Sequence, residues 1–65
     1  MRSKTLYTVI VADDEDELRE AVCSMIPWEE YGFKLVGSAS NGLDALQLVE
    51  ALQPDFLLTD IRMPF

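Results

Sequence analysis

The sequence contains no histidine and a single cysteine, Cys23. An internal disulfide is therefore excluded, and the His and Cys ligands of a structural zinc site are missing. A chain this short buries only about 60% of the surface that its unfolded form exposes, which leaves a small hydrophobic core. We therefore expect a bound ion or a second protein chain to supply the stability that the core cannot.

Basic residues are also scarce: 5 Lys and Arg face 12 Asp and Glu, which gives a net charge of −7. Such a charge disfavours direct binding to nucleic-acid phosphates, so DNA binding would require a domain outside this sequence. No apolar stretch approaches the roughly 20 residues of a membrane-spanning helix. Acidic residues at 13–17 interrupt the first apolar run too early for a signal peptide. We therefore expect a cytoplasmic protein without membrane contact.

The first two expected elements are a strand and a helix. Residues 6–12 are almost continuously apolar, which is typical of a parallel strand covered on both faces. Asp14, with Glu17 three residues later, resembles a capping box and predicts the helix start, and Pro27 predicts its end. Cys23 lies near the apolar side of this helix and is predicted to be an inert buried thiol. Helical spacing predicts that this side belongs to the core and contains Leu18, Ala21, Val22, Met25 and Ile26.

The same alternation continues along the rest of the chain. Residues 28–32 are predicted to form a connecting loop in which Trp28 and Tyr31 pack, with contact to a partner as the alternative. A second strand is predicted over 33–39. Asn41 is the expected cap of a second helix at about 43–52. The apolar side of that helix contains Ala45, Leu46, Val49 and Leu52. With a third strand over 56–59, the order is β-α-β-α-β, which predicts an α/β fold with parallel strands and right-handed crossovers.

Three aspartates directly follow two of these strands: Asp13 and Asp14 end the first, and Asp60 ends the third. The carboxyl ends of parallel strands share one edge of the sheet, where ligands bind in open α/β folds. Two unit charges 4 Å apart repel by roughly 4 kcal/mol at an effective dielectric near 20. A hard cation such as Mg²⁺, or protonation, would relieve that repulsion. A carboxylate in such a site can also act as a nucleophile toward phosphorus.

Each aspartate taken singly has a structural interpretation as well. Asp14 could only cap the helix, Asp13 could only face water at a strand end, and Asp60 could only form a turn ahead of Pro64. The combination of all three at two strand ends is more specific than any one of them. We therefore favour a magnesium site.

Two motifs carry a family resemblance. Residues 9–15 (VIVADDE) and 58–64 (LTDIRMP), joined by two helix–strand units, resemble the first half of a response-regulator receiver domain, the phosphoacceptor module of two-component signalling. The resemblance implies a flavodoxin-like fold with parallel strand order 2-1-3. Residues 27–33 (PWEEYGF), with Ser-Asn-Gly at 40–42, further resemble regulators of transcription whose output domain is an AraC-type helix-turn-helix.

The resemblance also assigns roles to individual residues. It implies that Asp60 accepts a phosphoryl group from a sensor histidine kinase. It implies that Asp13, Asp14 and Asp60, together with the main-chain carbonyl of Arg62, bind Mg²⁺. The choice of Asp60 as the phosphoacceptor and the ligand role of the Arg62 carbonyl rest on the resemblance alone.

The resemblance covers only part of the family's domain. It implies that residues 1–65 are a partial receiver domain, without strands four and five and helices three to five. The hydroxyl residue after strand four and the lysine after strand five are then absent, and Lys4 and Lys34 lie at no matching position. We therefore expect the chain alone to be phosphorylated poorly or not at all.

Two other functions are consistent with parts of the sequence. The chain could be a structural fragment that oligomerises through the exposed edge of its third strand, without phosphotransfer. It could instead be a magnesium-dependent phosphatase or phosphotransferase of the aspartyl-phosphate type. Such enzymes typically need a second aspartate two residues after the nucleophile, and position 62 is Arg. We therefore expect a signalling module and not an enzyme.

Overall fold

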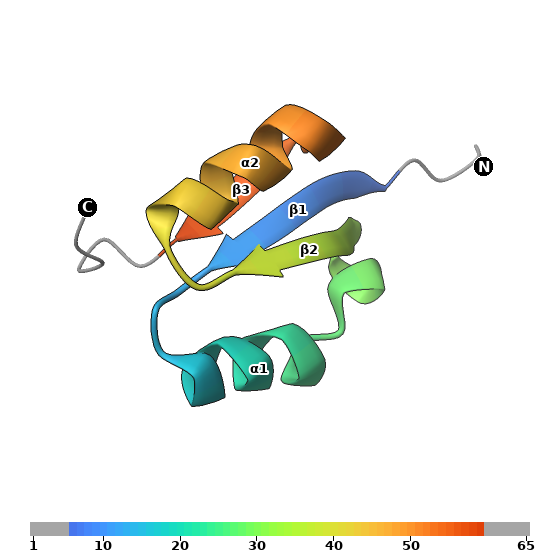
Figure 1. The fold of residues 1–65 in the computed structure, drawn as a ribbon. Coiled ribbons are helices and arrows are strands. Elements are labelled where there is room, and N and C mark those ends of the chain that lie inside the picture. Colours follow the sequence, from blue (N-terminus) through green and yellow to red (C-terminus); the bar gives the residue numbers. More distant parts are fainter. Residues whose placement is uncertain (1–5, 60–65) are drawn as a thin grey trace.

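The computed structural model describes residues 6–59. Three strands and two α-helices alternate along the chain, with one turn of 3₁₀ helix after the first α-helix (Figure 1). The elements are β1 (Tyr7–Ala12), α1 (Asp16–Met25), η1 (Trp28–Tyr31), β2 (Phe33–Ala39), α2 (Gly42–Leu52) and β3 (Phe56–Thr59). The predicted β-α-β-α-β order is confirmed, and each strand lies within one residue of its expected bounds.

The strands form one parallel sheet in the order β2-β1-β3, as expected. The central strand β1 has four consecutive residues that are at most 3% exposed, and Ile10 is completely buried. Burying a side chain of this size contributes about 2 kcal/mol. The prediction of a strand covered on both faces is therefore confirmed. The run is continuously apolar because β1 lies between two strands and between two helices.

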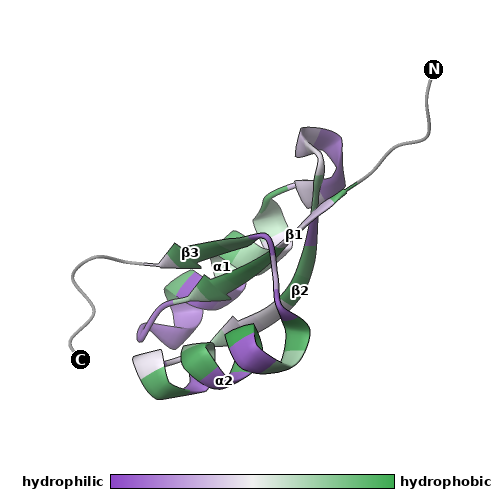
Figure 2. Ribbon diagram, turned by 90° about the horizontal axis from the view of Figure 1, so that it is seen from above, coloured by the Kyte–Doolittle hydropathy of each residue, from purple (hydrophilic) through white to green (hydrophobic). Residues whose placement is uncertain are grey.

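The two helices lie on opposite faces of the sheet (Figure 1). Figure 2 shows that β1 and β3 are largely apolar, whereas polar and apolar residues alternate around both helices. The buried contact between α2 and the sheet consists of small side chains, Ala12, Ala39 and Ala45, with Leu48 packed against them. Small residues at this contact allow the helix to lie close to the strands.

Strand β2 contains an irregularity that the sequence did not predict. Val9 pairs with Leu35, but the next residue, Ile10, pairs with Gly37, so β2 has one extra residue at this point. A Cβ atom at Gly37 would lie 3.4 Å from a terminal carbon of Leu48. The bulge thus places a residue without a side chain beneath α2, against Leu48 and Leu52.

Helix α2 begins as predicted. Asn41 has an extended backbone and its Oδ1 accepts a hydrogen bond of 2.8 Å from the main-chain N–H of Asp44. The predicted apolar side was wrong at Leu46 and Leu52, which are 53% and 46% exposed, and it omitted Leu48, which contacts the core. A helical period of 3.6 residues determines the direction of an apolar stripe only to within one neighbouring position, which explains the error.

Helix α1 differs from the prediction at its start and on its apolar side. The helix begins at Asp16 with Glu15 as its cap residue, and Glu15 makes no side-chain capping hydrogen bond. The expected capping box of Asp14 and Glu17 is therefore wrong. Its acidic first turn, Asp16 and Glu17, is as expected for the positive end of the helix dipole.

The apolar side of α1 was also predicted to be core, but no residue of this helix is buried. Leu18 is 42% exposed and Met25 is 77% exposed, while Ala21 and Val22 are half-buried. Periodicity establishes which side of a helix is apolar, but it does not establish how much of that side another element covers.

The segment between α1 and β2 is more regular than the loop that was predicted. Trp28–Tyr31 forms a 3₁₀ turn, which Gly32 ends with a φ of 87°. The indole Nε1–H of Trp28 donates a 3.0 Å hydrogen bond to the main-chain oxygen of Cys23 near the end of α1. Trp28 is half-buried, so its predicted packing role is confirmed, whereas Tyr31 is 68% exposed and its predicted packing is wrong.

Strand β3 is the most exposed part of the sheet. Phe56, Leu57 and Leu58 are each about half exposed, at 50%, 45% and 48%. The Phe56 ring packs edge-on against Tyr7 and Phe33, with ring centroids 5.8 and 5.6 Å apart. Within residues 6–59, no helix is long and apolar enough to cross a membrane.

Candidate functional site

The candidate site lies where the strands end, and Asp13 is its central described residue. The main-chain N–H of Asp13 donates a 3.0 Å hydrogen bond to the oxygen of Ala39, which extends the pairing of β1 and β2 by one residue. The Asp13 side chain is buried, with 8% of the residue exposed. A carboxylate so close to the ladder has a well-defined position.

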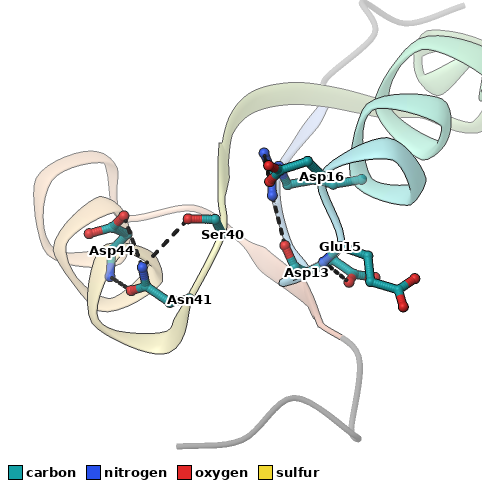
Figure 3. A network of polar contacts seen from close by, with 7 residues as sticks. Asp13, Glu15, Asp16, Ser40, Asn41 and Asp44 are labelled. Atoms are coloured by element: carbon teal, nitrogen blue, oxygen red, sulfur yellow. Dashed lines mark hydrogen bonds and ion pairs between the residues drawn. The ribbon is translucent and has the colours of Figure 1, made fainter.

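A short turn orients this carboxylate. Asp13 Oδ1 accepts a 2.9 Å hydrogen bond from the main-chain N–H of Glu15 (Figure 3). An aspartate that bonds the N–H two residues later forms an Asx turn. This turn explains why α1 begins at Asp16 and not near Asp14, because it takes up the residues that the expected capping box would have used.

Arg19 joins the end of β1 to the first turn of α1. Its Nη1–H donates a 2.8 Å hydrogen bond to the main-chain oxygen of Asp13, and its Nη2 lies 2.9 Å from Asp16 Oδ1. The Arg19 side chain is only 14% exposed. Sequence reasoning missed this residue, although its position three residues after Asp16 on a helix was a signal for an ion pair.

Asp14 is exposed beside Asp13. The ion pair of Arg19 goes to Asp16, and within residues 6–59 no ion pair neutralises the carboxylates of Asp13 and Asp14. Two carboxylates with an incomplete set of partners match the chemistry of a hard-cation site, because Mg²⁺ prefers oxygen ligands and usually takes one or two carboxylates together with water.

The remaining predicted ligands, Asp60 and Arg62, lie outside the described residues, as do Met63 and Pro64. The described part of the chain contains no group of three His, Cys, Asp or Glu side chains that could hold a metal ion. The structure therefore brings Asp13 and Asp14 to one place at the end of β1, and it shows the neighbouring strand β3 up to Thr59. Thr59 pairs directly with Ala12, the residue before Asp13.

A second polar group follows β2 at the same edge of the sheet (Figure 3). Asn41 Nδ2–H donates to Asp44 Oδ2 at 3.3 Å and to Ser40 Oγ at 3.5 Å, in addition to the cap that Asn41 provides. These bonds involve residues close in the sequence, and they fix the start of α2. We therefore assign this group to the fold and not to the site.

Cys23 lies away from the sheet edge on α1. Burial raises the pKa of its thiol above the ordinary value of 9.0, Arg19 acts in the opposite direction, and Glu20 raises it further. Thiolate, the nucleophilic form, is therefore scarce near neutral pH. This agrees with the predicted inert thiol, although Cys23 is half-buried and not fully buried.

Comparisons with known proteins give the family. A model of the response regulator receiver domain matches residues 9–65. An uncharacterized response regulatory protein of Staphylococcus epidermidis is 46% identical over 59 residues, which are 91% of this chain and 24% of that protein. The transcriptional regulatory protein HptR of Staphylococcus aureus is 41% identical over 59 residues, again 91% of this chain and 23% of that protein. The chain thus spans about a quarter of the length of these curated relatives.

A solved structure supports the same assignment. The REC domain of AraT, a response regulator from Geobacillus stearothermophilus, superposes with a TM-score of 0.83 at 34% sequence identity. The match covers 94% of this chain and 47% of that one. The chain belongs to the response regulator receiver domain family, and the predicted family and fold class are confirmed. Receiver domains serve two-component signalling, use Mg²⁺ at the phosphorylation site and receive phosphate from histidine kinases.

Proposed function

We propose that this chain is the phosphoacceptor part of a response regulator and that Asp60 is its phosphorylation site. The observation that carries the proposal is the pairing of Ala12 with Thr59. Asp13 and Asp60 each follow one of these paired residues by a single peptide bond, and paired strands lie about 4.8 Å apart. This register supports a shared site for their carboxylates at the edge where α/β sheets bind ligands.

In the proposed site, Asp13, Asp14, Asp60 and the main-chain carbonyl of Arg62 would hold Mg²⁺. Bound Mg²⁺ supplies positive charge that stabilises the oxygens of the transferring phosphoryl group. The Asx turn at Asp13 and the bond from Arg19 to its main-chain oxygen keep this residue in place. Because Arg19 contacts Asp13 through the main chain, it holds the loop without occupying the carboxylate.

The proposed reaction transfers a phosphoryl group from a phosphohistidine of the kinase. A carboxylate oxygen of Asp60 attacks phosphorus, an O–P bond forms and the N–P bond breaks, and the imidazole nitrogen leaves with the electron pair. The whole regulator would then control transcription through an output domain, as the name of the relative HptR suggests. An AraC-type output domain remains part of this proposal.

We further propose that residues 1–65 form one partial receiver unit that by itself is phosphorylated poorly or not at all. The match to only 47% of the AraT chain supports this. Of the two lysines in the sequence, Lys34 pairs with Thr8, which is five residues before Asp13 on β1. Five residues of strand span about 16 Å, so the Lys34 ammonium does not reach a phosphoryl group at this end of the sheet.

The test measures Mg²⁺ binding by the 65-residue chain through the amide chemical shifts in NMR spectra. Chemical shifts at residues 13 and 14 should move with saturable dependence on Mg²⁺. The double variant Asp13→Asn, Asp14→Asn and the single variant Asp60→Asn should each weaken binding at least tenfold, because each removes a charged ligand. Lys34→Gln is the matched control at the opposite end of the sheet and should bind normally. Normal Mg²⁺ binding by Asp60→Asn would contradict the shared site.

Phosphorylation itself can be tested with acetyl phosphate and Mg²⁺, read by intact mass. We expect at most a slow, partial gain of one phosphoryl group, and none in Asp60→Asn. Rapid and complete labelling would show that the family's lysine after strand five is not required for phosphorylation. Labelling that persists in Asp60→Asn would show that Asp60 is not the phosphoacceptor.

A second proposal concerns self-association through β3, with or without phosphotransfer. The outer edge of this strand is apolar and contains no charged residue within Phe56–Thr59. An apolar hollow adjoins it and is lined by Val9, Trp28, Phe33, Phe56, Leu57 and Leu58. Pairing of two β3 strands would produce a continuous six-stranded sheet and satisfy the main-chain groups at this edge.

Light scattering tests this association at micromolar protein concentration. Because each copy carries a net charge of −7, the dimer fraction should rise with salt concentration, which screens the repulsion. Leu58→Lys should shift the chain to monomer. A wild-type chain that stays monomeric at high salt would refute the association.

A further inference from the structure

The register of β3 against β1 determines which residue of the chain comes to lie beside Asp13. The four pairs are Val9 with Phe56, Ile10 with Leu57, Val11 with Leu58 and Ala12 with Thr59. Sliding β3 by one residue moves every side chain to the opposite face of the sheet. The proposed metal site therefore depends on a single register.

Apart from the edge-on contacts of Phe56 with Tyr7 and Phe33, hydrophobic burial does little to select this register. Phe56, Leu57 and Leu58 are consecutive apolar residues with nearly equal exposure, between 45% and 50%. A slip by one residue would exchange one half-exposed apolar side chain for another. Register is strongly specified only where an alternating pattern has one buried face, and β3 has no such alternation.

Four hydrogen bonds between Thr8 and Asp55 do distinguish the registers. Asp55 Oδ2 accepts from the main-chain N–H of Thr8 at 2.8 Å and from its hydroxyl at 3.2 Å. The N–H of Asp55 in turn donates to Thr8 Oγ1 and to the main-chain oxygen of Thr8, both at 3.0 Å. A slip of one residue moves β3 by about 3.3 Å and separates all four pairs.

We propose that Thr8 and Asp55 form a register lock and act as positioning residues for the site at the other end of β1 and β3. The inference rests on the proposed function, in which Asp13 and Asp60 share Mg²⁺. Asp55 lies four residues before Thr59, at the beginning of β3. The strand Phe56–Thr59 alone separates Asp55 from the site by about 13 Å, which exceeds the Debye length of about 10 Å in 0.1 M salt.

This separation yields a specific expectation. The charge of Asp55 contributes little to metal binding directly, so its effect on Mg²⁺ affinity must come through the register of the strand. Apparent affinity falls by the fraction of molecules that have the competent register. Losing the lock should therefore weaken Mg²⁺ binding in proportion to the slipped population.

The experiment compares Asp55→Ala with the conservative variant Asp55→Asn in the 65-residue chain. Asn retains an oxygen that accepts from the Thr8 N–H, so it should keep both the register and the wild-type Mg²⁺ affinity. Asp55→Ala removes the two hydrogen bonds that Asp55 Oδ2 accepts and should lower the ratio of competent to slipped register about fivefold for each bond lost. The Mg²⁺ affinity should fall by the resulting decrease in the competent fraction. Comparing Thr8→Val with Thr8→Ser makes the same test from the β1 side. These two variants replace the Asp55 variants if Asp55→Ala does not fold.

Gln47→Gly separates positioning from general stability. Gln47 is exposed in the middle of α2, which packs mainly against β1 and β2, and glycine there lowers helix stability. It should lower the melting temperature as Asp55→Ala does, yet leave the Mg²⁺ dissociation constant unchanged. If Gln47→Gly and Asp55→Ala weaken Mg²⁺ binding equally, the loss follows stability and the register lock is refuted.

Strand register can be read directly from NMR contacts between backbone protons. Wild type and Asp55→Asn should show one set, with Val11 opposite Leu58, whereas Asp55→Ala should add a second set with Val11 opposite a neighbour of Leu58. A single wild-type set in Asp55→Ala refutes the lock. If the wild-type chain itself binds no Mg²⁺, the proposed function fails, and the backbone contacts alone still decide on the lock.

Discussion

Arg19 is expected to be among the most important polar side chains for the stability of this chain. Its guanidinium donates to the main-chain oxygen of Asp13 at 2.8 Å and pairs with Asp16 at 2.9 Å, and its side chain is only 14% exposed. We consider the substitution Arg19→Met, which keeps an unbranched side chain with good helix propensity and removes both interactions.

The two interactions differ in expected strength. A largely buried hydrogen bond from a charged donor contributes about 1.5 to 3 kcal/mol. The pair with Asp16, whose side chain is 73% exposed, contributes about 0.5 kcal/mol or less. Arg19→Met should therefore lower the free energy of unfolding by about 2 kcal/mol. That is a large share of the roughly 3 to 10 kcal/mol expected at this chain length.

Urea unfolding followed by the fluorescence of Trp28, the single tryptophan, measures this change. Because one kcal/mol shifts the melting temperature of a small domain by about 4 to 8 °C, a decrease of about 10 °C should accompany it. Asp16→Asn is the matched control, since it removes only the exposed ion pair and should change stability by about 0.5 kcal/mol. If Arg19→Met lies within 0.5 kcal/mol of wild type, or if Asp16→Asn matches its loss, the bond to Asp13 is not the stabilising contact.

Three further predictions concern the cap, a turn and the thiol. Asn41→Ala removes the bond to the Asp44 N–H and should destabilise α2 by about 1 kcal/mol in urea unfolding, whereas Asn41→Asp, which can still accept, should lose only a few tenths. Gly32→Ala should lower the free energy of unfolding by about 1 kcal/mol through backbone strain alone, because φ is 87° and no atom lies within 4 Å of the added carbon. If Gly32→Ala is as stable as wild type, the left-handed conformation at this position is wrong. The native pKa of Cys23 is raised above 9.0, so its contribution to stability should be complete below that pH and decline as pH rises through the native pKa. Cys23→Ala should remove this decline, and an unchanged slope in the variant would assign it to other groups.

The sequence contained enough information for the element order and for placing Asp13 and Asp14 directly after the first strand. Strand bounds at 33–39 and 56–59 follow from short apolar runs between turn residues, and the Asn41 cap follows from contacts within four residues. Such features depend on neighbours in the chain, so pattern and propensity determine them. The motif around Asp13 and Asp14 likewise lies at the end of a strand that its apolar composition predicts.

Only the tertiary structure decided the contacts between distant residues. Thr8 and Asp55 are 47 positions apart, and their hydrogen bonds depend on the register of two strands that no local pattern specifies. The Asx turn at Asp13 moved the start of α1, and the contact of Gly37 with Leu48 accompanies a bulge in β2. Periodicity identified the apolar side of α1, but the exposure of Leu18 and Met25 depends on which elements cover that side. Burial and register are properties of pairs of elements, and for that reason a single segment of sequence does not determine them.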